Sequence, residues 1–89
     1  MKVFVSIADT VGVALLNSGS SHNFIDVIMV QRAGVLLQPC PTLLVTVANG
    51  DRVASPGKAM AQSVSISGEA FDLNLYALPL GEYDMVLGV

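Results

Sequence analysis

Short segments with strand-like patterning, separated by turn residues, run along most of this chain and limit its possible folds more than any other feature. Residues 2–8 (KVFVSIA) alternate with a period of two and are rich in β-branched residues, which predicts a strand. Further strands are expected at 12–16, 43–48, 60–67, 71–78 and 85–88. About seven short strands and at most one helix are the pattern of a small β-barrel or sandwich.

Turn signals lie between these segments. Asn49-Gly50 is the strongest of them, because this dipeptide favours the left-handed backbone of a tight hairpin. Weaker two-residue turns are expected at Asp9-Thr10 and Gly68-Glu69. Residues 24–33 are ambiguous: their β-branched side chains favour a strand, whereas Asp26 looks like a helix N-cap and Gly34 like a helix stop.

Composition limits the class of protein. Eighty-nine residues make one domain. Of these residues 53% are apolar and only 12% are charged, and the core of so small a domain cannot bury all of the apolar side chains. A surface for a partner is therefore expected. The apolar runs 13–16 and 27–30 are far shorter than the roughly 20 residues of a bilayer-spanning helix, so no membrane partner is expected.

The remaining composition argues against other partners and compartments. Four scattered basic residues and a net charge of −3 leave no basic patch, so nucleic acid is not an expected ligand. The start of the chain lacks the pattern of a secretory signal, and Cys40 is the only cysteine. Both features favour an intracellular, cytoplasmic location.

The polar segment 17–23 (NSGSSHN) directly follows the most apolar strand and is the best candidate for chemistry. A serine nucleophile with His22 as its base is one alternative, but residues so close in a loop rarely align and no orienting acid is evident. We expect instead that His22 and Asn23 form hydrogen bonds within the loop or at its edge. One histidine with dispersed carboxylates predicts no metal site.

Three sequence motifs occur along this chain in the same order as in one protein family. ALLNSGSSHNFI resembles the active-site loop of retropepsin-like aspartic proteases, above all those of Ty3/gypsy-type LTR retrotransposons; LLVTVANGDRV resembles their flap hairpin, and YDMVLGV their late apolar-apolar-Gly strand. The resemblance covers nearly all of residues 1–89. It implies a single protease domain that is mostly β, a small closed β-barrel with one short helix at 26–33. It also implies that the sequence stops short of a C-terminal helix and strand common in the family.

The resemblance also assigns the site. In this family two protomers each contribute one aspartate, the pair shares a proton, and a water activated by it attacks the peptide without cofactor or metal. Asn17 stands where the family carries that aspartate, with Ser18 expected to bond across the dimer axis and Gly19 to permit close approach. The flap residues would be Ala48, Asn49, Gly50 and Asp51. The candidate residues for the walls of the cleft are Leu16, Val47, Val53 and Val86, and most of them could equally belong to the core.

An amide cannot serve as a general base, so we expect this Asn17 form to fold, to bind peptides and to hydrolyse them negligibly. The asparagine is either an engineered inactivating change or natural decay. Three functions remain open at this point. They are an endopeptidase that processes a retrotransposon polyprotein, an inactive relic that acts as a dimerisation or peptide-binding module, and an unrelated small β-barrel binding module.

Overall fold

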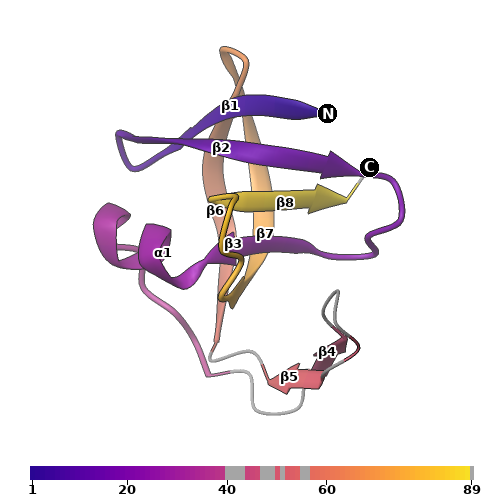
Figure 1. The fold of residues 1–89 in the computed structure, drawn as a ribbon. Coiled ribbons are helices and arrows are strands. Elements are labelled where there is room, and N and C mark those ends of the chain that lie inside the picture. Colours follow the sequence, from indigo (N-terminus) through magenta and orange to yellow (C-terminus); the bar gives the residue numbers. More distant parts are fainter. Residues whose placement is uncertain (40–43, 47–49, 51, 55–56, 89) are drawn as a thin grey trace.

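The fold consists of eight strands and one short helix in the residues that the structure describes. The structure is a computed structural model that describes residues 1–39, 44–46, 50, 52–54 and 57–88 (Figure 1). The elements in these residues are β1 (Lys2–Ile7), β2 (Thr10–Asn17), β3 (Asn23–Asp26), α1 (Val27–Ala33), β4 (Leu44–Thr46), β5 (Arg52–Ala54), β6 (Lys58–Ile66), β7 (Glu69–Leu78) and β8 (Met85–Gly88). The mostly β fold with one short helix, predicted from the sequence, is therefore confirmed.

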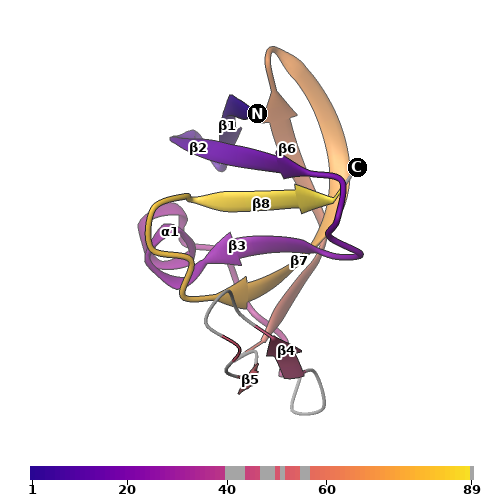
Figure 2. The same cartoon turned by 45° about the vertical axis from the view of Figure 1, so that its right-hand side comes forward.

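Six strands close into a barrel in the order β1-β2-β8-β3-β7-β6. The last strand, β8, lies between β2 and β3, parallel to β2 and antiparallel to β3 (Figure 2). Because parallel neighbours end at the same edge, the C-terminal ends of β2 and β8 lie side by side. This arrangement brings the polar segment after β2 next to the end of the last strand.

Two hairpin turns lie one residue earlier than the sequence indicated. Ile7 pairs with Thr10, so the first turn is Ala8-Asp9, and both residues have positive φ (48° and 64°). Ile66 pairs with Glu69, so the later turn is Ser67-Gly68, again with positive φ at both positions. The predicted turns at Asp9-Thr10 and Gly68-Glu69 are therefore wrong by one position, because the pairing register leaves only these two residues unpaired.

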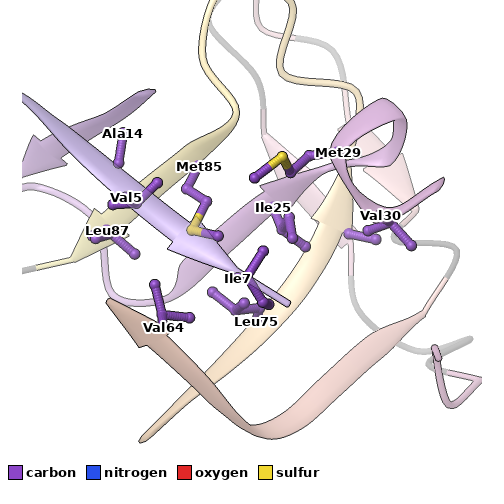
Figure 3. Close-up of a cluster of buried hydrophobic side chains, with 11 residues drawn as sticks. Val5, Ile7, Ala14, Ile25, Met29, Val30, Val64, Leu75, Met85 and Leu87 are labelled. Carbon is purple, nitrogen blue, oxygen red and sulfur yellow. The ribbon is translucent and has the colours of Figure 1, made fainter. Parts of the chain in front are cut away.

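The hydrophobic core fills the inside of the barrel and extends under the helix. Alternate residues of the strands point inward, as the period of two requires, among them Val5 and Ile7 of β1 and Met85 and Leu87 of β8. Figure 3 shows these side chains packed with Met29 and Val30 of α1. The members of the buried cluster are Val5, Ile7, Ala14, Ile25, Met29, Val30, Val64, Leu75, Ala77, Met85 and Leu87.

The ambiguous segment contains a strand followed by a helix. β3 ends at Asp26, whose carboxylate accepts a hydrogen bond from Ile28 N (3.2 Å) and so caps α1. The other carboxylate oxygen accepts one from Leu80 N (2.8 Å), which ties the helix start to the loop after β7. Gly34 ends the helix in the left-handed region, as predicted. Within the described residues no helix has the length and apolarity to span a membrane.

A separate two-stranded sheet lies outside the barrel. β4 and β5 pair antiparallel, with Leu44 opposite Ala54 and Thr46 opposite Arg52 (Figures 1 and 2). Gly50 lies between these strands with φ of 89°, a backbone that glycine adopts without strain. The other three predicted flap residues, Ala48, Asn49 and Asp51, lie outside the described residues.

Candidate active site

Asn17 is the last residue of β2 and lies at the edge where two parallel strands end. It pairs with Gly88 of β8, and the side chains of Asn17 and Ser18 are both exposed to solvent. The apolar strand before it anchors this position, because Ala14 is completely buried three residues earlier. The Asn17 side chain is therefore presented to solvent from a strand that the core holds in place.

The segment after Asn17 folds into a tight turn held by the asparagine itself. Gly19 N donates to Asn17 Oδ1 (2.9 Å), and Ser20 N donates to the main-chain oxygen of Asn17 (3.1 Å). This side-chain-to-backbone ring is an Asx-turn. The three predicted catalytic-position residues, Asn17, Ser18 and Gly19, are thus brought together at one turn, and the Ser18 hydroxyl makes no hydrogen bond to another described residue.

Gly88 allows β8 to approach this turn. A Cβ built on Gly88 would lie 2.5 Å from the main-chain oxygen of Ser20 and 3.3 Å from that of His22. Gly88 N also donates to Asn23 Oδ1 (2.9 Å), so both ends of the loop are fastened to β8. The sequence pointed to the apolar-apolar-Gly strand but not to this role of its glycine, which depends on contacts between residues far apart in the sequence.

His22 contacts a neighbouring serine and two aromatic rings. Its Nδ1 lies 3.0 Å from Ser21 Oγ, and its ring packs edge-on against Tyr76 with centroids 5.2 Å apart and lies near Phe24. No carboxylate among the described residues forms a hydrogen bond or ion pair with His22. The serine–histidine pair therefore lacks the orienting acid of a triad, and the expectation that His22 and Asn23 bond within the loop or at its edge is confirmed.

An apolar hollow of about 300 Å³ opens beside the turn. It is lined by Leu16, Asn23, Ile66, Phe71, Leu73, Leu87 and Gly88. Of the candidate cleft residues, Leu16 lines this hollow and Val86 does not, while Val47 and the side chain of Val53 lie outside the described residues.

The arrangement determines which chemistry the single protomer offers. The Asn17 amide accepts and donates hydrogen bonds but cannot take a proton from water near neutral pH. Nothing in the described parts of the protein groups three or more histidine, cysteine or acidic side chains as a metal site would need. The site as it stands is a hydrogen-bonding turn beside an apolar hollow.

Comparison with known proteins agrees with this geometry. The chain matches the aspartyl protease family over residues 3–89. No curated protein sequence matches it. In structure it is similar to the retroviral protease-like domain of Ddi1 from Leishmania major, with a TM-score of 0.77 and 17% sequence identity over 99% of this chain and 70% of that one. The similarity confirms the retropepsin-like barrel predicted from the sequence, and an unrelated β-barrel is ruled out. With nearly its whole length matched, this chain belongs to the aspartyl protease family.

Proposed function

We propose that this chain is one protomer of a homodimeric aspartic endopeptidase domain that processes a retrotransposon polyprotein, and that Asn17 makes the present form inactive. The observation that carries the proposal is the exposed Asn17-Ser18-Gly19 turn at the end of β2. The resemblance of the sequence around this turn to the family's active-site loop is why we propose that position 17 is the place of the catalytic carboxylate.

One such turn is half of a site. A single protomer offers one Asn17 side chain, and the catalysis of this family needs two carboxylates that share one proton. A twofold axis through the turn would bring a second copy of the same residues opposite, which is how a symmetric interface completes itself. The exposed Ser18, whose hydroxyl bonds to no other residue that the structure describes, and the apolar hollow beside Leu16 support a partner at this edge.

The side chain at position 17 decides the activity. With aspartate there, one carboxylate of the pair removes a proton from water while the other, protonated, polarises the peptide carbonyl. In a homodimer of the Asn17 form both carboxylates are missing at once. Loss of a general base commonly costs several orders of magnitude in rate, so turnover falls to what binding alone provides.

The substrate we propose is an extended peptide segment of a polyprotein inside the cell. Its backbone would pair with strand edges while its side chains enter apolar pockets, the usual way in which β domains bind peptides. β4 and β5 form a two-stranded sheet separate from the barrel, and we propose that it closes over such a peptide.

The decisive test is the Asn17→Asp variant. We expect it to cleave reduced, unfolded casein and a mixed synthetic peptide library at mildly acidic pH, with activity falling on both sides because the pair must carry a single proton. The Asn17→Ala variant is the matched control and should stay inactive. Light scattering at several concentrations should show the mass of a dimer. A folded, dimeric Asn17→Asp variant that cleaves none of these substrates would overturn the endopeptidase proposal.

A second candidate is an inactive relic that binds peptides or dimerises, and the amide at position 17 is the observation that favours it. The two candidates differ in what the Asn17 form itself does. If the relic function is correct, the Asn17 form binds library peptides with an affinity equal to that of its Asp variant, and the Asp variant does not cleave them.

A further inference from the structure

We infer that Asn17 is a site of spontaneous deamidation, and that this reaction slowly converts the inactive protein into one that carries aspartate at the catalytic position. The first half of the inference concerns the chemistry of one asparagine and is independent of function. The second half, recovery of activity, rests on the proposed endopeptidase function.

The reaction needs only water. The main-chain nitrogen of Ser18 attacks Cγ of Asn17 and loses its proton; the bond between Cγ and Nδ2 breaks, and ammonia leaves with that proton. The product is a five-membered succinimide ring. Water then opens the ring at one of its two carbonyl carbons, giving either aspartate or isoaspartate, in which the backbone runs through Cγ. Such chemistry changes the charge of the site by one negative unit.

The turn geometry favours the first step. The hydrogen bond from Gly19 N to Asn17 Oδ1 (2.9 Å) closes a ring that includes the nitrogen of Ser18, so the amide and the nitrogen that would attack it belong to one tight turn. The same N–H polarises the amide carbonyl and would stabilise negative charge as it develops on Oδ1. The Gly19 N–H therefore both holds the amide group of Asn17 in the turn and activates its carbonyl carbon toward attack.

Access and neighbouring side chains favour it as well. Asn17, Ser18 and Gly19 are all exposed in the single protomer, so water can reach the reacting amide there and ammonia can leave. The residue after the asparagine is a small, unbranched serine, which crowds the approaching nitrogen less than a β-branched side chain would.

The other two described asparagines are held differently. Asn23 Oδ1 accepts a hydrogen bond from Gly88 N of β8, and Asn74 Oδ1 accepts one from Ala61 N of β6, so each side chain is bonded to another strand and not to its own turn. Both precede large buried residues, Phe24 and Leu75 respectively. Among the described asparagines only Asn17 combines an exposed small neighbour with a bond from its own turn.

Mass spectrometry of the aged, folded protein tests the inference. The protein is incubated near neutral and at mildly alkaline pH in ¹⁸O-labelled water, then cut with trypsin. Cleavage after Lys2, Arg32, Arg52 and Lys58 places Asn17 and Asn23 in peptide 3–32, Asn49 in 33–52 and Asn74 in 59–89. Fragmentation then separates Asn17 from Asn23, and aspartate from isoaspartate. We expect Asn17 to convert at least about tenfold faster than Asn23 or Asn74, with one labelled oxygen incorporated.

Two variants make the assignment specific. Ser18→Val leaves the attacking nitrogen in place but crowds it, and should slow conversion at position 17 by about tenfold while the Asn49 peptide reacts as before. Asn17→Gln keeps an amide but would have to form a less favourable six-membered ring, and should neither change mass nor gain activity. Circular dichroism confirms that both variants are folded. A Ser18→Val variant that converts at the parent's rate would contradict the inference.

The chemical and functional halves can fail separately. If Asn17 keeps its amide while Asn49 converts, the inference is wrong, whatever the activity of the Asn17→Asp variant. If Asn17 converts but the Asn17→Asp variant is inactive, deamidation stands and the endopeptidase function fails. If the variant is active and the aged protein is not, ring opening gives isoaspartate alone and the recovery of activity is refuted. The expected result is proteolysis that grows with the fraction of protomers carrying aspartate.

Discussion

Asp84 occupies the space that a side chain at position 12 would need. A Cβ built on Gly12 would lie 2.6 Å from Asp84 Oδ2 and 2.8 Å from Asp84 Cβ. The same Oδ2 accepts a hydrogen bond from Val13 N (2.8 Å), and Oδ1 faces Arg32 of α1 at 3.7 Å. The carboxylate thus joins β2, the helix and the loop before β8, and glycine at position 12 is what lets it lie there.

Gly12→Ala should therefore lower the free energy of unfolding by about 1 to 3 kcal/mol, the usual cost of overpacking a well-packed site. Urea denaturation monitored by circular dichroism measures it. A double-mutant cycle with Asp84→Gly provides the control, because the methyl group then meets neither the carboxylate nor the Cβ of residue 84. The alanine at position 12 should cost clearly less in that background, and equal costs in both backgrounds would refute the contact as the cause.

Asp26→Ala should also destabilise the fold strongly. The side chain is buried, and its two oxygens satisfy Ile28 N at the helix start and Leu80 N after β7. Removing them leaves two main-chain donors without partners, for an expected loss of about 2 to 4 kcal/mol. Asp72→Ala is the matched control, since Asp72 is an exposed strand residue and its loss should change stability by less than about 0.5 kcal/mol. Similar losses for the two variants would contradict the capping role.

Much of the barrel could be predicted from the sequence because its strands follow a simple alternation of apolar and polar residues. Val5 and Ile7 lie inside while Phe4, the residue before Val5, is 73% exposed, as a period of two requires. Residues 24–33 could not be assigned from propensity, because a short strand and a short helix meet at Asp26. Only the pairing of β3 with β7 and β8 distinguishes the two.

The turn at the candidate site was predictable to a similar extent. The local motif pointed to Asn17, Ser18 and Gly19, and these neighbouring residues do form one turn. The roles of Gly12 and Gly88 were not predictable, since the atoms that exclude a Cβ at those positions come from Asp84 and Ser20, far away in the sequence. A glycine in a strand signals close approach of something, but the sequence does not say of what.

The position of the first hairpin turn can be tested with two glycine substitutions. Ala8 has φ of 48°, a region that costs an ordinary residue energy and glycine almost none. Ala8→Gly should therefore raise the free energy of unfolding by about 0.5 to 1 kcal/mol. Thr10→Gly should lower it by a similar amount, because Thr10 already belongs to β2 and pairs with Ile7. Opposite results for the two variants would place the turn at Asp9-Thr10, as the sequence alone suggested.

If the proposed function is correct, Gly88→Ala should disable the candidate active site through the loop that carries position 17. The added Cβ would lie 2.5 Å from the main-chain oxygen of Ser20, and neither partner is the end of a flexible side chain, so the Asn17 turn has to move away from β8. In the Asn17→Asp background we expect kcat/KM to fall by about 100-fold, which is the usual loss when a catalytic group is misplaced by an ångström.

Gly12→Ala in the same background is the matched control. It is the same chemical change at the far end of β2, and it should lower the stability but not the activity of each folded dimer. The readout is cleavage rate per folded dimer, with folding checked by circular dichroism and mass by light scattering. If Gly88→Ala left that rate unchanged, β8 would not hold the catalytic turn in place.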